Sequence, residues 1–132
     1  MRTLLAWLSG SEIKVSADPD ILITGDLNAY AMEDPIQAAV GQGFVDLSST
    51  DPEFPRVSSY VFKGESGTLD YIMATASAAS QRVGEIIHYH VNADETGALE
   101  YDNCGTNAAC TVSLDQYRCS DHDMTVQDFN LV

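Results

Sequence analysis

ILITGDLNAY, residues 21–30, carries a short apolar run directly into Gly25, Asp26 and Asn28. The β-branched residues of this run favour a buried strand, and Gly25 marks its end. An acid and an amide two residues apart then stand where a strand ends, a position at which scaffolds often place binding and catalytic groups. A turn with an Asx cap would have the same sequence, so Asp26 and Asn28 need further partners before they indicate chemistry.

Further strand and helix signals lie on both sides of this stretch. Asp34 followed by Pro35 predicts a helix over residues 34–42, with Asp34 as its N-cap. β-forming residues on either side of KGESG, residues 63–67, predict a hairpin whose second strand contains Asp70. The remaining expected elements are helices over residues 3–8 and 77–82 and strands over residues 44–47, 83–91 and 125–132. About six strands with short helices indicate a mixed α/β fold.

Length and composition limit the possible classes of protein. At 132 residues the chain is at most one domain, and 45% hydrophobic residues with a mean hydropathy of −0.09 are typical of a soluble globular protein. No apolar run approaches the length that spans a bilayer, so no membrane partner is expected. Twenty acidic and six basic residues give a net charge of −14, which would repel DNA and fits divalent cations better. The spacing of Cys104, Cys110 and Cys119 matches no zinc pattern, and whether two of them pair stays open.

Polar side chains gather at four expected strand ends. They are Asp26 with Asn28, then Asp70, then His88 and His90 with Asn92, Asp94 and Glu95, and finally residues 120–123. Carboxylates such as Asp26 and Asp121 suit a hard divalent cation such as Mg²⁺. His122 can move a proton near neutral pH, while Asp70 would fix its tautomer and Asn28 would contact a phosphate oxygen or position a water molecule. Each cluster also fits a plain structural interpretation, as a turn, a packed histidine or a solvated loop. Their joint occurrence favours metal-assisted hydrolysis of a phosphate ester.

Three motifs, in this order along the chain, resemble those of a known family. GDLNA (25–29), LDYI (69–72) and SDHD (120–123) are similar to motifs of the endonuclease/exonuclease/phosphatase superfamily, whose members share the DNase I-like fold. GDLNAYAMEDPI, SSYVFKGESGTLDYIMATAS, HVNADE and YRCSDHD look still more like the bacterial extracellular nuclease group. The resemblance extends from about Leu4 to Val132. It implies an α/β (α+β) fold, namely half of a DNase I-like four-layer α/β/β/α sandwich with a mixed β-sheet and short helices.

The resemblance also implies roles for individual residues. Asp26 would orient the attacking water and touch the metal, and Asn28 would contact the scissile phosphate. Asp70 would pair with His122, which contacts the phosphate or relays a proton, and Asp121 would contribute to the metal site. The implied cofactor is Mg²⁺, with Mn²⁺ or Ca²⁺ as alternatives, and the implied partner is DNA or another phosphodiester. The family also implies an extracellular or secreted location, although MRTLLAWLSG at the start lacks the features of a signal peptide.

The chain departs from the family pattern chiefly in its length. Family members are longer, and the match corresponds to their C-terminal half, so residues 1–132 are expected to form a single partial domain without the metal-binding Glu of the N-terminal half. Met124 also stands where the family has Pro. A lone half would expose the inner face of its sheet, so we expect a homodimer through that face. Two alternatives stay open: a catalytically incomplete half-domain that dimerises or pairs with a separate N-terminal half, or a phosphatase for smaller phosphate esters.

Overall fold

The computed structural model describes residues 1–10, 20–49, 58–91, 93–94 and 120–131. The elements in chain order are α1 (Arg2–Leu8), β1 (Leu22–Asp26), α2 (Asp34–Gly41), β2 (Val45–Asp46), the 3-10 helix η1 (Leu47–Ser49), β3 (Tyr60–Phe62), β4 (Glu65–Gly67), β5 (Asp70–Ala74), α3 (Ala76–Ser80), β6 (Arg82–Tyr89) and β7 (Met124–Phe129). Cys104, Cys110 and Cys119 lie outside the described residues, so their pairing stays open. None of the described helices has the length and apolar character needed to cross a membrane.

The main sheet has three strands with β5 at its centre, in the order β1-β5-β2. In the register between β1 and β5, Asp26 is the partner of Asp70. Two smaller sheets are formed by β3 with β4 and by β6 with β7. The expected α+β class is therefore confirmed. The described strand pairs are antiparallel, so among them the parallel pairs of a mixed sheet do not occur.

The predicted hairpin around KGESG is wrong in its pairing. β3 pairs with β4, which lies inside the segment expected to be a loop, and β5 instead joins β1 and β2. Lys63 and Gly64 have φ angles of 51° and 85°, so the chain reverses there in a two-residue turn. Such a turn brings Phe62 opposite Glu65, so Glu65–Gly67 becomes a strand and not a loop.

The start of α2 also differs by one residue from the prediction. Glu33 is the N-cap with an extended backbone, and Asp34 is already the first helical residue. The Glu33 carboxylate accepts the backbone N–H of Tyr30 at 2.9 Å, so the acid of this turn acts on the loop before the helix. The last strand, β7, begins at Met124 and ends at Phe129, which is earlier than expected.

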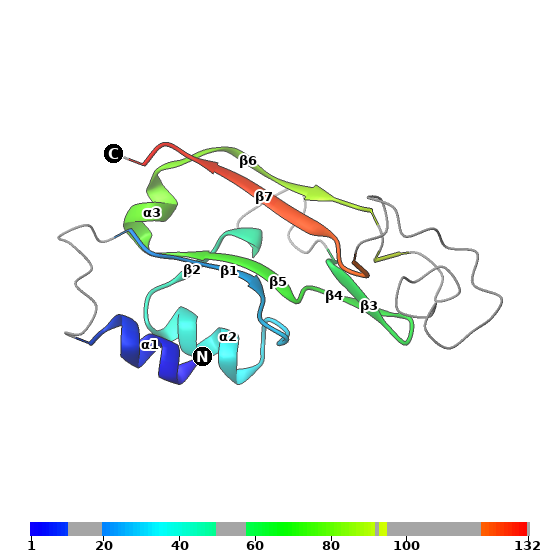
Figure 1. The fold of residues 1–132 in the computed structure, drawn as a ribbon, viewed down its shortest axis with the longest axis horizontal. Coiled ribbons are helices and arrows are strands. Elements are labelled where there is room, and N and C mark those ends of the chain that lie inside the picture. Colours follow the sequence, from blue (N-terminus) through cyan, green and yellow to red (C-terminus); the bar gives the residue numbers. More distant parts are fainter. Residues whose placement is uncertain (11–19, 50–57, 92, 95–119, 132) are drawn as a thin grey trace.

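Helices α1 and α2 cover one face of the main sheet (Figure 1). Tyr71 and Met73 of β5 point to this face and are buried with residues of both helices. The other buried members of this core are Leu5, Ile23, Ala29, Ile36, Ala39 and Phe44. Because side chains alternate along a strand, Ile72 and Ala74 point to the opposite face.

The opposite face of the main sheet is covered by β6 and β7 (Figure 1). Ile72 and Ala74 are 8% and 0% exposed and pack in a second core with Ile86 and Phe129. The expectation that this inner face is exposed is therefore wrong for these residues, because the chain lays its own β6–β7 pair across β5. Exposed apolar side chains lie instead on β6 and β7 themselves: Val83, Ile87, Tyr89, Met124 and Val126.

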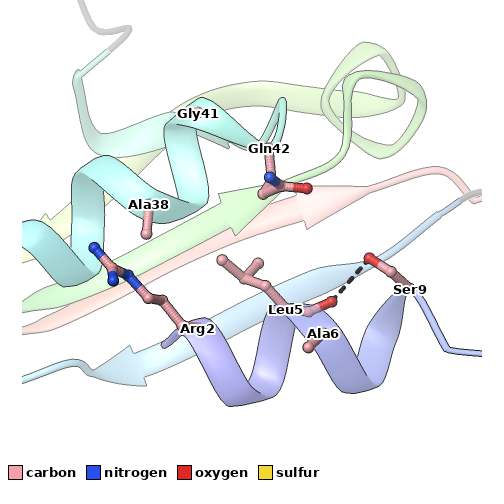
Figure 2. A pocket seen from close by; sticks show the side chains of 7 residues that line it. All are labelled: Arg2, Leu5, Ala6, Ser9, Ala38, Gly41 and Gln42. Carbon is pink, nitrogen blue, oxygen red and sulfur yellow. Dashed lines mark hydrogen bonds between the residues drawn. The ribbon is translucent and has the colours of Figure 1, made fainter.

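A pocket of about 500 Å³ lies between α1 and α2 (Figure 2). Its lining includes Arg2, Leu5 and Gln42, and the Ser9 hydroxyl at the end of α1 donates to the Leu5 carbonyl oxygen at 2.8 Å. The pocket contains none of the residues that the sequence motifs single out. The polar strand ends therefore lie elsewhere in the fold.

Candidate active site

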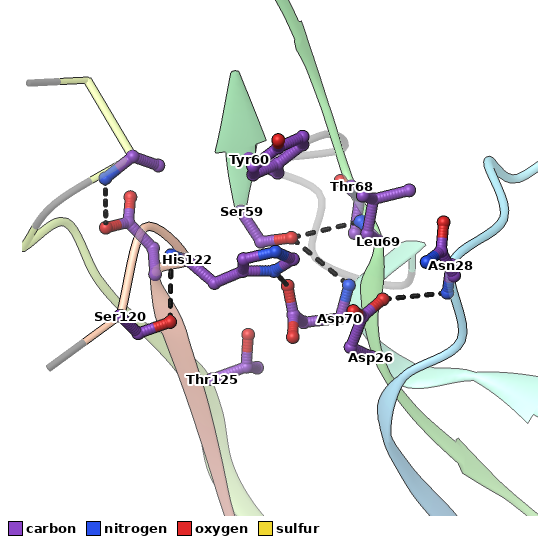
Figure 3. A network of polar contacts seen from close by, with 12 residues as sticks. Asp26, Asn28, Ser59, Tyr60, Thr68, Leu69, Asp70, Ser120, His122 and Thr125 are labelled. Atoms are coloured by element: carbon purple, nitrogen blue, oxygen red, sulfur yellow. Dashed lines mark hydrogen bonds and ion pairs between the residues drawn. The ribbon is translucent and has the colours of Figure 1, made fainter. Parts of the chain in front are cut away.

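A histidine–carboxylate pair forms the centre of the candidate site (Figure 3). His122 Nδ1 lies 2.7 Å from Asp70 Oδ2, and each side chain is 20% exposed. Asp70 is the first residue of β5, and His122 stands two residues before β7 begins. Two motifs separated by 52 positions in the chain thus meet at one place.

The contact with Asp70 determines how His122 presents its second nitrogen. A carboxylate has no proton to donate, so Asp70 accepts the Nδ1 proton and leaves Nε2 as the other functional atom of the ring. A neutral imidazole in this tautomer accepts a proton at Nε2, and the protonated ring donates one from the same atom. The pair is therefore suited to general acid–base chemistry.

Ser59 ties this pair to the rest of the fold. Its side chain is 2% exposed, and its hydroxyl oxygen accepts the backbone N–H groups of Leu69 and Asp70 at 3.0 and 3.1 Å. The Ser59 carbonyl oxygen accepts the N–H of Asp123 at 2.8 Å. One residue therefore fixes the start of β5 and the residue that follows His122.

Tyr60 fixes the imidazole ring from its face. The rings of Tyr60 and His122 are stacked, with centroids 4.6 Å apart and planes at 25°. The backbone N–H of His122 donates to the Ser120 hydroxyl at 3.1 Å. The ring of His122 is therefore held by the Asp70 carboxylate at its edge and by Tyr60 on its face.

Asp26 and Asn28 lie at the same end of the main sheet (Figure 3). Because Asp26 and Asp70 are direct cross-strand partners, their carboxylates are on one side of the sheet, where two like charges oppose each other. The backbone N–H of Asn28 donates to Asp26 Oδ1 at 2.7 Å, and Asn28 has a φ of 47°. Gly25, with a φ of 126°, turns the strand end into this loop at a backbone angle that glycine adopts readily.

The fit of these residues to a divalent metal is partial. Asp26 and the half-buried Asp121 supply carboxylate oxygens, which suit a hard cation. Among the described residues, however, no three His, Cys, Asp or Glu side chains gather closely enough to hold an ion. The described part of the chain does not complete a metal site by itself, and the predicted roles of Asp26 and Asp121 as ligands stay predictions.

Space for a ligand exists beside Asp70. A pocket of about 510 Å³ lies between the main sheet and β7, with Asp70 and Thr24 among its polar lining residues. Leu22 and Val126 are among its apolar lining residues. The pocket therefore adjoins the Asp70 carboxylate of the candidate site.

A buried carboxylate that the sequence analysis left unassigned lies behind the site. Asp123 is 3% exposed, and one of its oxygens accepts the backbone N–H groups of Val91 and Ala93 at 2.7 and 3.1 Å. Its other oxygen lies 3.1 Å from His90 Nδ1. The second acid of SDHD was the available sequence signal, because a buried charge requires partners. Ser59 and Tyr60 gave no such signal.

The described histidines of the third expected cluster make their described contacts outside the candidate site. His90 contacts Asp123, whereas His88 Nδ1 lies 3.4 Å from the Thr125 hydroxyl. Asp94 is exposed, and Asn92 and Glu95 are outside the described residues. Of the third predicted cluster, none is in contact with Asp70 or His122 among the described contacts.

Negative charge near the site also acts on a buried tyrosine. Burial, together with the nearby carboxylates of Asp46, Glu33 and Asp70, raises the pKa of Tyr71 to about 12. The Tyr71 hydroxyl donates to the Thr68 carbonyl oxygen at 3.0 Å. Tyr71 is therefore a neutral packing residue beneath the site at physiological pH.

A comparison with known families identifies the chain's relatives. Residues 2–122 match the Endonuclease/Exonuclease/phosphatase family. Neither the curated proteins nor the solved structures gave a match. The matched range contains the whole GDLNA and LDYI motifs as well as the Asp70–His122 pair. Members of this family generally use divalent metal ions. The chain belongs to the endonuclease/exonuclease/phosphatase family, a superfamily of phosphodiesterase- and phosphatase-type hydrolases.

Proposed function

We propose that this chain hydrolyses phosphodiester bonds, with DNA as its substrate and His122 as its general acid–base residue. The observation that carries the proposal is the 2.7 Å contact between His122 Nδ1 and Asp70, made at the strand end where Asp26 and Asn28 also lie. A histidine with an oriented tautomer is suited to proton transfer at neutral pH.

The reaction needs one proton removed and one delivered. A water oxygen attacks phosphorus, the bond from phosphorus to the leaving sugar oxygen breaks, and the leaving oxygen takes up a proton. His122 Nε2 serves one of these transfers, since Nδ1 is bound to Asp70. The Asn28 amide donates to a non-bridging phosphate oxygen, and Asp26 orients the water. A positioned acid–base residue of this kind contributes about 10²- to 10⁴-fold in rate.

The cofactor we propose is Mg²⁺, with Mn²⁺ and Ca²⁺ as the alternatives. The carboxylates of Asp26 and Asp121 and the net charge of −14 support a divalent cation. Since the described residues form no group of three ligands, further ligands would have to come from water, from the substrate or from residues outside the described ranges.

The lack of a group of three metal ligands among the described residues favours a second candidate. This candidate is a catalytically incomplete domain that binds a cation or a partner chain without turnover. The net charge of −14 similarly favours a third, a phosphatase for smaller phosphate esters, because a long polyanion is repelled more strongly than a small one. An extracellular location stays a prediction from the family resemblance.

Two substrates separate these candidates. We expect the purified chain to nick plasmid DNA in the presence of Mg²⁺ or Mn²⁺, and we expect EDTA or His122→Ala to abolish the nicking. Turnover of a small phosphate ester without DNA cleavage would establish the phosphatase instead. A folded chain that cleaves neither substrate would contradict hydrolysis and favour the incomplete domain.

We also propose a homodimer, now through β6 and β7 and not through the inner face of the main sheet. The support is the group of apolar side chains exposed on these strands, among them Ile87 and Met124. Light scattering should give twice the mass of one chain, and Ile87→Lys should shift it toward the monomer. A monodisperse monomer over a wide concentration range would contradict the dimer.

A further inference from the structure

An exposed aromatic row begins at the candidate site and runs along β3. Phe62 is 52% exposed, and its ring centroid lies 6.4 Å from that of Tyr60, with the ring planes at 20°. Tyr60 in turn stacks on His122 at 4.6 Å. Because Tyr60 and Phe62 are two apart in a strand, both rings stand on the same side of the β3–β4 hairpin. Tyr60 supports His122, the proposed acid–base residue, whereas Phe62 has no role in the proposed reaction.

A cation stands over the outer ring of this row. Lys63 Nζ lies 5.1 Å from the centroid of the Phe62 ring. Lys63 is also one of only six basic residues in the chain, and its φ of 51° is uncommon for a residue with a side chain. Two-residue turns of this kind favour Asn or Gly at this position. The chain therefore accepts a strained turn that places a rare positive charge beside an exposed aromatic ring.

We propose that Phe62 and Lys63 form a binding site for one nucleotide of a single-stranded nucleic acid. The base stacks on the Phe62 ring, and the Lys63 ammonium contacts the adjoining phosphate. The proposal rests on the proposed function, because it makes a nucleic acid strand, in preference to a small phosphate ester, the substrate that reaches His122.

The energetics of the two ring contacts support an exchange. Stacking of a base on an aromatic side chain is stronger than a cation–π contact at an exposed site, so a base can take the place of the Lys63 ammonium on the ring. Sequence is not read by such a contact, because every base has an aromatic face. A base in a duplex is already stacked on its neighbours, so an unpaired strand is the form that this site takes up.

One charged neighbour opposes binding and sharpens the test. Glu65 is the cross-strand partner of Phe62 and is exposed on the same side of the hairpin. With a net charge of −14, the chain repels a polyanion in general. Binding is therefore expected to be weak and strongly dependent on salt, and Glu65→Gln is expected to tighten it.

Binding can be measured without catalysis. The probe is a fluorescently labelled single-stranded oligo(dT), titrated into the His122→Ala protein in EDTA and low salt. Phe62→Ala should raise the dissociation constant about 10-fold. Phe62→Trp should keep the affinity of the parent protein, because the indole offers a larger stacking face. The matched control is Trp7→Ala, which removes an exposed aromatic side chain of α1 and should leave binding unchanged.

Lys63→Asn gives two effects of opposite sign. The substitution should raise the thermal midpoint, since Asn before Gly64 suits the turn, and it should weaken oligo(dT) binding. It should also make the negative slope of log affinity against log salt concentration shallower by about 0.7, the value for one phosphate contact on a single strand. A purely structural role for Lys63 would change the thermal midpoint and leave the salt slope as it was.

The outcomes separate this inference from the proposed function. Oligo(dT) binding that depends on Phe62 and Lys63 supports the inference, whether or not the wild-type chain cleaves DNA. Binding that is absent, that is equal with and without Phe62→Ala in the His122→Ala protein, or that is as tight for a duplex overturns it. In that case hydrolysis of a small ester that requires His122 would leave the proposed acid–base chemistry standing.

Discussion

The described residues include two histidine–carboxylate pairs, and His122 of one pair is adjacent in sequence to Asp123 of the other. The pairs differ in what surrounds the carboxylate. In the pair His122–Asp70 both side chains are 20% exposed, whereas in the pair His90–Asp123 the histidine is 53% exposed and the acid only 3%. Asp123 also accepts the backbone N–H groups of Val91 and Ala93. Contact between a histidine and an acid therefore does not by itself mark a site.

What separates the pairs is the use made of the acid. The Asp123 carboxylate accepts backbone N–H groups of the residues that follow β6 and so connects the end of β6 to the start of β7. This role is structural. Asp70 is itself held, by the Ser59 hydroxyl at its N–H, and it offers its carboxylate to His122 beside Asp26 and Asn28. We infer that His122–Asp70 serves chemistry and that Asp123 serves stability.

The largest expected difference between the pairs is in activity. His122→Ala should lower kcat/KM for a phosphodiester by about 10²- to 10⁴-fold, because it removes the acid–base residue. His90→Ala should change kcat/KM only slightly, since its exposed ring touches the structural acid. Steady-state kinetics of both variants beside wild type measure this contrast. Equal losses in the two variants would break the distinction between the pairs.

The next largest effect is on stability. Asp123→Ala should lower the free energy of unfolding by about 2 to 4 kcal/mol, because the buried N–H of Ala93 and the part-buried N–H of Val91 lose their acceptor. Urea unfolding followed by circular dichroism gives this quantity. The matched comparison is Asp94→Ala, an exposed acid nearby, for which a change under about 0.5 kcal/mol is expected. A small change for Asp123→Ala would mean that its buried carboxylate is not structural.

The free energy of unfolding should also depend on pH through Tyr71, the buried tyrosine beneath the site. Its pKa of about 12 in the folded chain exceeds the ordinary tyrosine value of 10.0, so the unfolded chain loses the phenol proton first as the pH rises. Stability from this group is therefore complete below pH 10.0 and is lost toward pH 12, by about 2 to 3 kcal/mol at most. Below pH 10.0 the free energies of unfolding of wild type and Tyr71→Phe should differ by a constant amount, and above pH 10.0 wild type should lose stability relative to Tyr71→Phe. Parallel pH profiles would contradict the raised pKa.

The smallest expected effect is a gain in stability at the site itself. Asp26→Asn removes one of two like charges that face each other across β1 and β5, and it keeps an oxygen for the N–H of Asn28. We expect the free energy of unfolding to rise by up to about 0.5 kcal/mol while activity falls. A loss of stability in urea unfolding would show that the Asp26 carboxylate stabilises the loop, and it would contradict a destabilising repulsion between Asp26 and Asp70.

Sequence motifs predicted the contact between Asp70 and His122 but not how these residues are held. GDLNA, LDYI and SDHD each stand at a strand end, and strand ends that share an edge of a sheet bring such residues together, so the meeting of Asp70 with His122 could be anticipated. The support from Ser59 could not, because a serine in a polar stretch has no feature that distinguishes a buried acceptor from a solvated hydroxyl.

The fold shows the same limit. The apolar runs of β1 and β5 predicted buried strands, but the partner of β5 depends on long-range packing and not on local pattern. The turn at Lys63 and Gly64 requires two positive φ angles, and a lysine there gives no signal of one. The predicted hairpin failed at that point. Coverage of Ile72 by Ile86 and Phe129 likewise depends on how β6 and β7 cross the sheet.

The most direct test measures activity and stability together in Asp70→Asn and Asp123→Ala. Each variant removes the carboxylate of one histidine–carboxylate pair, and Asp123→Ala also removes the acceptor of the backbone N–H groups of Val91 and Ala93. We predict that Asp70→Asn loses activity by about 10²-fold or more with little change in the free energy of unfolding, on the order of 1 kcal/mol. We predict the reverse for Asp123→Ala: a clear loss of stability with activity retained by the molecules that stay folded. If Asp70→Asn keeps its activity, or if both variants lose activity and stability in parallel, the assignment of chemistry to His122–Asp70 is wrong.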